Sequence, residues 1–163
     1  MKATVLYDSK TGNTAKMAEY IVAGMQSVAG VEARAFHIDK LDPEYANASK
    51  LLVVGTPTYN GYLSGKMKTW LESGPAKLKV AGKLAGSYAT AAYIHGGGEL
   101  AVQCVLTHLM VEGMMAYSAG GAKGNPVIHL GPVAIAPRLG EFEELFIIYG
   151  RRMAEQAVLL FGN

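Results

Sequence analysis

The chain has 163 residues, of which 50% are hydrophobic and 17% charged. This composition excludes an intrinsically disordered chain, and the length predicts one domain, residues 1–163, that can bury a sizeable core. The formal net charge of +2 is scattered without a basic block, which argues against a nucleic-acid-binding protein.

The sequence also argues against membrane, secreted and metal-binding classes. No run approaches 18 apolar residues, so we expect no membrane span, and the first residues lack the apolar stretch of a signal peptide, which predicts a cytoplasmic protein. The single cysteine, Cys104, excludes an internal disulfide and a thiolate metal cage, and we expect an inert buried thiol. We expect structural roles for His37, His108 and His129, because their spacing does not suit a metal.

Buried strands alternate with amphipathic helices along the chain. Strands are predicted at residues 3–7, 32–38, 51–55 and 84–92, followed by 115–119 and 127–136 as one interrupted or two short strands. A first helix is predicted where Met17, Ile21, Met25 and Val28 recur at helical spacing, with a stop at Gly30. Further helices are predicted near 43–48, from about Gly65, over 99–112, and along the apolar positions from Phe142 to Leu160. The 99–112 helix is apolar nearly all round, so we expect it to be well covered.

This alternation predicts an α/β fold, a five-stranded parallel sheet with helices on both faces. Right-handed crossovers leave few strand orders, and one of them is 2-1-3-4-5. In that order the chain reverses direction between strands 1 and 3, and ligands bind beyond the carboxyl ends of those strands. The loops at 8–14, 55–62 and 93–99 all fall at this edge, and each is rich in glycine, hydroxyl or aromatic residues.

The loop after the first strand has the chemistry of a phosphate site. Ser9, Thr11 and Thr14 offer hydroxyls, Gly12 lets the backbone bend towards a guest, and the helix that starts near Asn13 presents free N–H groups. The alternative is a plain helix cap by the same side chains. Neither G-x-x-x-x-G-K-[ST] nor G-x-G-x-x-G occurs, which excludes the triphosphate loop and the usual dinucleotide fingerprint.

Three segments carry a resemblance to a known family. Residues 9–14, SKTGNT, resemble the T/S-x-T-G-x-T phosphate loop of flavodoxins. Residues 55–68 are similar to the G-T-P-T-R-F-G-x-x-S-G-x-M segment of the NAD(P)H:quinone oxidoreductases called tryptophan-repressor-binding proteins, and residues 95–99 to their T-G-G-G-Q-E. The likeness covers nearly the whole chain and implies a three-layer flavodoxin-like fold that binds FMN non-covalently.

The resemblance assigns the site residue by residue. It places the phosphate contacts on Ser9, Lys10, Thr11, Gly12, Asn13 and Thr14. It places the isoalloxazine contacts on Pro57, Thr58, Tyr59, Asn60 and Gly61, and on Ala92, Tyr93, Ile94, His95, Gly96 and Gly97. No side chain is assigned a catalytic role, because a cofactor of this kind supplies the chemistry itself.

The sequence departs from the oxidoreductase pattern in three places. Tyr59-Asn60 stands where those enzymes have R-F, and Glu112 replaces a histidine before Gly113-Met114. The regions before the third and last strands are short here, whereas the enzymes carry long insertions that help build a tetramer and a quinone pocket. Neither feature is therefore inherited, and a homo-oligomer stays one open alternative.

Three functions remain open at this point. The first is an FMN electron carrier serving a redox partner protein, which the length favours. The second is an oxidoreductase that uses NAD(P)H to reduce a small quinone or a free flavin. The third is a non-redox interaction protein on the same fold. Only Asp8 and Glu99 bring acidic groups to the ligand loops, so little negative charge opposes the reduced anionic flavin, and we expect a less negative second potential than in strongly acidic flavodoxins.

Overall fold

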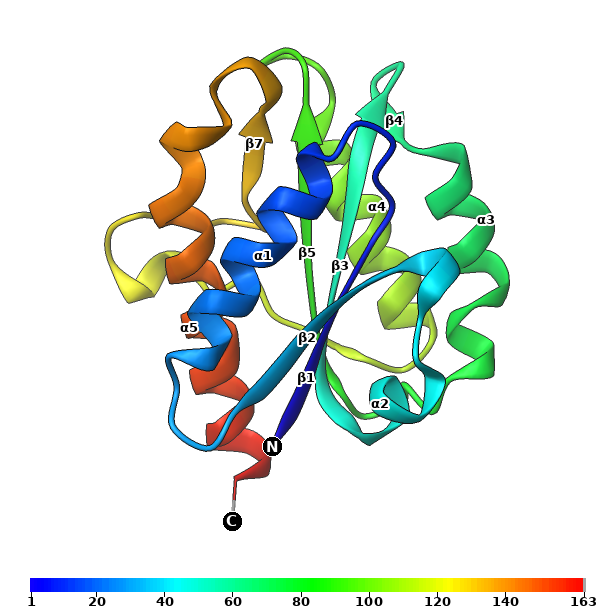
Figure 1. Ribbon diagram of the computed structural model, residues 1–163, viewed down its shortest axis with the longest axis vertical. Coiled ribbons are helices and arrows are strands. Elements are labelled where there is room, and N and C mark those ends of the chain that lie inside the picture. The colour runs from blue at the N-terminus through cyan, green and yellow to red at the C-terminus, as the bar shows by residue number, and fades with distance from the viewer. Residues whose placement is uncertain (163) are drawn as a thin grey trace.

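The computed structural model describes residues 1–162 and arranges them as a twisted sheet between two layers of helices (Figure 1). The strands are β1 (Lys2–Tyr7), β2 (Glu32–His37), β3 (Ser49–Tyr59), β4 (Tyr62–Leu63), β5 (Leu84–Ala91), β6 (Met115–Ala116) and β7 (Val133–Ile135). The helices are α1 (Asn13–Gln26), α2 (Pro43–Ala48), α3 (Gly65–Ser73), α4 (Gly98–Val111) and α5 (Glu143–Phe161). Short 3-10 helices span Ile38–Lys40, Pro75–Lys77, Gly121–Lys123 and Ala136–Phe142.

The parallel strands run in the order β2-β1-β3-β5-β6, which confirms the predicted fold class and strand order. The sheet has seven strands rather than the predicted five. The predicted fifth strand is two pieces, because β6 pairs with the start of β5 and β7 with its end. The other addition, β4, pairs antiparallel with the end of β3 and forms a hairpin inside the predicted 55–62 loop.

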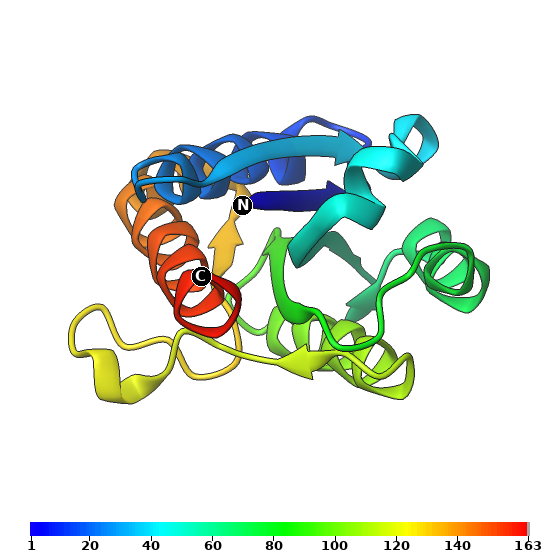
Figure 2. The ribbon, with the colours of Figure 1, turned by 90° about the horizontal axis from the view of Figure 1, so that it is seen from below.

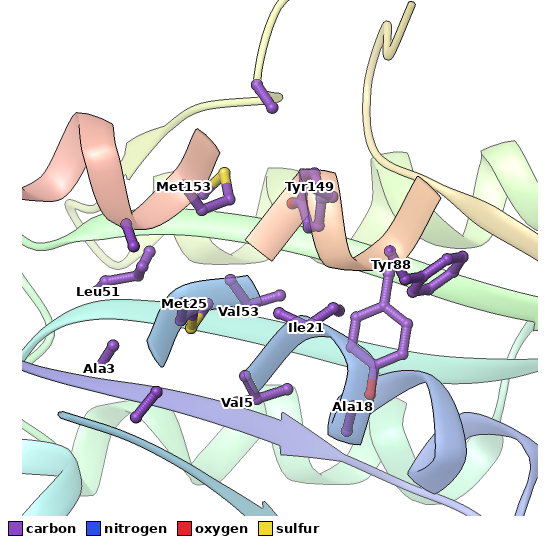
Figure 3. Packing of buried hydrophobic residues seen from close by; sticks show 14 of the residues in the cluster. Ala3, Val5, Ala18, Ile21, Met25, Leu51, Val53, Tyr88, Tyr149 and Met153 are labelled. Carbon is purple, nitrogen blue, oxygen red and sulfur yellow. The ribbon is translucent and has the colours of Figure 1, made fainter. Parts of the chain in front are cut away.

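Side chains alternate between the two faces of the sheet, and each face has its own core. On one face Val5, Leu51 and Val53 pack against α1 and α5, and on the other Leu52 and Val54 pack against α3 and α4. Figure 2 shows the two helix layers on opposite sides, and Figure 3 shows part of the first core, with side chains from β1, β3 and β5 meeting those of α1 and α5. Burial on both faces explains the near-continuous apolar runs of these strands.

Helices α1 and α5 lie in close contact because each contributes a glycine to their interface. A Cβ on Gly24 would lie 2.0 Å from the carbonyl oxygen of Ile147, and a Cβ on Gly150 would lie 2.1 Å from that of Ile21. Any larger residue at either position would push the two backbones apart.

The prediction that the 99–112 helix is well covered is wrong. Its inner stripe packs on the sheet, but its outer face is open to solvent, and Leu100, Met110 and Val111 are 47%, 51% and 81% exposed. For the same reason Cys104 is half-buried rather than fully buried. The apolar character of this segment therefore overstated its coverage.

Candidate functional site

The first loop turns on Gly12, which adopts a left-handed conformation with φ +90° and would place a Cβ in open space. Gly12 is also the N-cap of α1, and because glycine has no side chain it cannot cap the free N–H groups of that helix. The Ser9 hydroxyl accepts a hydrogen bond from the Ala15 amide at 3.3 Å, which closes the loop over the first turn. The first turn of α1 carries no acidic residue, so its positive dipole end is available to an anion.

Two residues of strand β5 form hydrogen bonds to Thr14, at the end of the first loop. The Thr14 and Thr90 hydroxyls are hydrogen-bonded at 2.8 Å, and the buried Tyr88 hydroxyl donates to the Thr14 carbonyl oxygen at 3.0 Å. The Tyr88 ring, labelled in Figure 3, fits because residue 55 is glycine. A Cβ at residue 55 would lie 2.0 Å from the ring. The Thr14 hydroxyl is thus occupied within the protein.

The second loop is a tight hairpin between β3 and β4. Asn60 and Gly61 form its two-residue turn, with φ values of +51° and +78°, as expected for this dipeptide at a turn of the I′ type. Gly61 meets the third loop directly, because a Cβ on Gly97 would lie only 2.2 Å from the Gly61 carbonyl oxygen. The hairpin and the third loop therefore touch through two glycines.

A cavity of 530 Å³ opens between the hairpin and the third loop. Its lining residues all belong to the predicted ring contacts: Thr58, Tyr59, Asn60, Gly61, Ala92, Tyr93, His95 and Gly96. Pro57, Ile94 and Gly97 do not line it. Pro57 is buried within β3 opposite Thr90, and Ile94 is 64% exposed.

Thr58 carries an orphaned buried hydroxyl. Within residues 1–162 its Oγ1 atom has no hydrogen-bond partner although the atom is buried, and Thr58 lies on the cavity wall. A buried hydroxyl without a partner costs about 1–3 kcal/mol. A polar ligand in the cavity would satisfy it, whereas a purely apolar one would not.

Asp8 lies between the first loop and α3 and is only 6% exposed. Its Oδ2 atom accepts a hydrogen bond from the Ser64 hydroxyl at 2.6 Å, and its Oδ1 atom lies 3.6 Å from Nε2 of His37. This carboxylate therefore faces its own partners rather than a ligand phosphate. Sequence reasoning treated Asp8 as a loop acid and His37 as a structural histidine, and no local pattern could join residues from the ends of β1 and β2 and the start of α3.

Comparison with known proteins gives the same class as the geometry. The flavodoxin family model matches residues 5–101. The chain is 36% identical to a flavodoxin from Clostridium saccharobutylicum, over 99% of this chain and 100% of that protein. It is 28% identical to an NAD(P)H dehydrogenase (quinone) from Chromohalobacter salexigens, over 69% of this chain and 68% of that protein.

A solved structure agrees over nearly its full length. The crystal structure of a flavodoxin, WrbA-like protein from Agrobacterium tumefaciens superposes with a TM-score of 0.80 at 25% identity, covering 97% of this chain and 98% of that one. A parallel sheet in this order, with helices on both faces and glycine-containing loops at its carboxyl edge, defines a flavodoxin-like fold. The chain belongs to the flavodoxin family, whose members transfer electrons through bound FMN.

Proposed function

We propose that this protein is an electron carrier that holds one FMN non-covalently at the carboxyl edge of its sheet, as a single domain of residues 1–163 serving a redox partner protein. The observation that carries the proposal is the partnerless, buried Thr58 hydroxyl on the wall of the cavity between the two glycine loops. FMN supplies the redox chemistry when bound. The residues described below bind and orient it.

The first loop suits the phosphate group of FMN. The hydroxyls of Ser9 and Thr11 and the N–H groups at the start of α1 are uncharged donors, and the bend at Gly12 aims them at one point. The exposed Lys10 adds a positive charge at the rim. Fixed donors of this kind bind a dianion without a buried counter-charge.

The 530 Å³ cavity suits the isoalloxazine ring. Tyr59 is 44% exposed and Tyr93 is 76% exposed, so both aromatic side chains are free to stack on a flat ring. The peptide between Asn60 and Gly61 lies at the hairpin tip, where its rotation would turn a carbonyl acceptor towards a bound flavin ring. Gly61 permits that rotation because it has no Cβ.

An NAD(P)H-dependent quinone or flavin oxidoreductase is the second candidate. The similarity to the quinone dehydrogenase of Chromohalobacter salexigens favours it. A further cavity of 340 Å³, lined by residues that include Glu99, His129 and Leu145, offers room for a small substrate. Neither feature identifies a nicotinamide site, so we rank the oxidoreductase below the electron carrier. NAD(P)H is proposed as a reductant only for the oxidoreductase.

The location is also part of the proposal. None of the helices in residues 1–162 is long and apolar enough to cross a membrane. We propose a cytoplasmic location on different grounds. The lone Cys104 cannot form an internal disulfide, so the fold does not need an oxidising compartment.

One set of measurements tests the function. The purified protein is expected to show the visible spectrum of a flavin, and its apoprotein to bind FMN at least about a hundredfold more tightly than riboflavin, which lacks the phosphate. Reduction by a ferredoxin reductase, with no turnover on NADPH plus a quinone, would support the carrier. Rapid bleaching by NADPH and quinone turnover would establish the enzyme instead. A colourless protein that ignores FMN would refute both.

A further inference from the structure

Among the described residues that line the cavity between the hairpin and the third loop, His95 alone carries an ionisable nitrogen. The other ionisable side chains on this wall are Tyr59 and Tyr93, whose phenol groups are neutral near pH 7. No carboxylate, lysine or arginine of residues 1–162 lines the cavity. A ring bound there would therefore meet one side chain that changes charge near neutral pH, because histidine ordinarily titrates at about pH 6.5.

The backbone of the third loop holds His95 at this wall. The Gly96 amide donates to the Tyr93 carbonyl oxygen at 3.0 Å, which closes a tight turn with His95 inside it. Beyond the turn, Gly97 packs so closely on the hairpin that a Cβ there would lie 2.2 Å from the Gly61 carbonyl oxygen. Since the His95 side chain is exposed, its imidazole can exchange a proton with solvent.

Charged side chains on the elements around this loop have other places. Those of the first loop and of α4 line other cavities, and those that follow β7 pair with each other at 3.3 Å: Asp8, Lys10, Glu99, Arg138 and Glu141. The hairpin, residues 58–63, contributes no charged side chain. Within residues 1–162 the histidine that lies beside carboxylates is His37. No carboxylate of the described residues therefore fixes the charge of His95, and a charged ligand would decide it.

We infer that His95 is the charge partner of the reduced flavin ring and takes up a proton when bound FMN is reduced. The inference rests on the proposed function, which supplies both the FMN and the redox partner that reduces it. Two-electron reduction adds two electrons and one proton to FMN, so the ring gains one negative charge. The His95 imidazole takes a second proton from solvent, and the positive imidazolium then stabilises the negative ring.

Spectroelectrochemical titration of the FMN-bound protein between pH 6.5 and 8.5 tests this inference. His95→Gln removes the charge at every pH, and His95→Lys keeps a positive charge throughout this range. Relative to His95→Gln, we expect His95→Lys to favour reduced over oxidised FMN by about tenfold at every pH, the effect of one opposite charge at a solvent-open site. The wild type should exceed His95→Gln by about fivefold at pH 6.5, which is about 20 mV for a two-electron couple, and by less than about 1.5-fold at pH 8.5.

The matched control is His108→Gln. His108 lies in the last turn of α4, whereas the third loop leads into the first turn, and its Nδ1 atom lies 2.8 Å from the Cys104 carbonyl oxygen. This variant should keep the wild-type preference for reduced FMN at every pH. Affinity for oxidised FMN reports whether each variant folds, and we expect it within about threefold of the wild type because His95 is exposed.

The outcomes separate this inference from the proposed function. If the wild type and His95→Gln bind FMN and show equal preferences for its reduced form, or differ by the same factor at every pH, the inference is overturned and the proposed function stands. A change of the same size in His108→Gln would also overturn it, because loss of a distant histidine would then suffice. Failure of the wild type to bind FMN would refute the proposed function and this inference together.

Discussion

The Thr58 hydroxyl makes opposite predictions for the free and the flavin-bound protein. Thr58→Val keeps the shape of the side chain and removes a hydroxyl that has no partner within the described residues. We expect the apoprotein to be as stable as the wild type or more stable by up to about 1 kcal/mol, because an unsatisfied polar group is removed. We expect FMN affinity to fall by about tenfold, the loss of one hydrogen bond. Urea unfolding and FMN titration measure the two effects.

The control for Thr58 is Thr107→Val on the outer face of α4. The Thr107 hydroxyl donates to the Gln103 carbonyl oxygen at 2.9 Å and lies far from the ligand loops along the helix. This variant should bind FMN normally. A destabilised Thr58→Val apoprotein with unchanged FMN affinity would assign Thr58 to the core instead of the site.

Substitutions at Gly97 and Gly82 distinguish the effect of backbone strain from the effect of the contact between the hairpin and the third loop. Gly97→Ala places a methyl group 2.2 Å from the Gly61 carbonyl oxygen, in a residue with φ +87°. Gly82→Ala imposes a similar strain at φ +77°, but its methyl group meets open space. Gly82→Ala should lose about 1–2 kcal/mol of stability, the cost of a left-handed alanine, and Gly97→Ala should lose more because it adds the clash with Gly61. Only Gly97→Ala should also weaken FMN, because it forces the hairpin away from the third loop.

Chemical denaturation and FMN titration of both glycine variants check this prediction. Equal FMN affinities in Gly97→Ala and Gly82→Ala would show that the contact between the two loops is irrelevant to binding. A loss of affinity in both would point to a general effect of reduced stability.

At the scale of elements, a side chain of α5 makes hydrogen bonds to β5 that a neighbouring strand would otherwise make. Between β6 and β7 the chain leaves the sheet, and the backbone of Ser87 on β5 faces the gap. The Tyr149 hydroxyl fills it, accepting from the Ser87 amide at 3.0 Å and donating to the Ser87 carbonyl oxygen at 3.1 Å. Three residues further along α5, the buried Arg152 side chain donates to carbonyl oxygens of residues 123–126. Helix α5 thus binds β5 at the gap between β6 and β7 and also binds the loop at residues 123–126 that separates these two strands.

We predict that Tyr149→Phe destabilises the protein by about 2–4 kcal/mol, because one buried amide and one buried carbonyl lose their partner together. Urea unfolding measures the loss. Tyr117→Phe removes the hydroxyl of a half-buried tyrosine whose amide donates to Ala85 on β5, and it is the matched control, with an expected change of less than about 0.5 kcal/mol. Equal stabilities of the two variants would mean that, in Tyr149→Phe, water replaces the hydrogen bonds of Tyr149 to the Ser87 backbone without loss of stability.

At the scale of the whole molecule, buried tyrosines set the alkaline limit of stability. Burial raises the pKa of Tyr45 to about 12, and it raises the pKa of Tyr88 and of Tyr149 above their ordinary value of 10.0. In the unfolded chain these groups ionise near pH 10. Above that pH the unfolded state therefore loses protons that the folded state keeps, and stability falls as pH rises.

The expected result is a stability that is flat with respect to these groups below about pH 9 and falls above pH 10, by about 1.4 kcal/mol per pH unit for each buried tyrosine. Tyr149→Phe should reduce that slope by one such increment, in addition to its constant loss of stability. Urea unfolding between pH 8 and 11 measures both. An unchanged slope in Tyr149→Phe would show that its hydroxyl reaches solvent in the folded protein.

The local pattern of residues predicted most of the elements, because strands buried on both faces and amphipathic helices leave strong periodic signals. The runs around Val5 and Val53 became β1 and β3, and the spacing of Met17, Ile21 and Met25 became α1. The turn at Asn60-Gly61 is local too, since the dipeptide itself prefers that conformation. The assignment of these loops to FMN stays a prediction until binding is measured.

By itself the sequence determined the fold class, the strand order and the positions of three unusual loops along the chain, because periodicity and turn chemistry depend only on neighbours along the chain. That these loops bind a ligand stays a prediction. The tertiary structure alone decided which polar groups have partners. It joined Thr14 to Thr90 and Asp8 to Ser64, left Thr58 without a partner among the described residues, and left the outer face of α4 uncovered. Those outcomes depend on contacts between residues as far as 76 positions apart, and no local pattern encodes which side chains such contacts will satisfy.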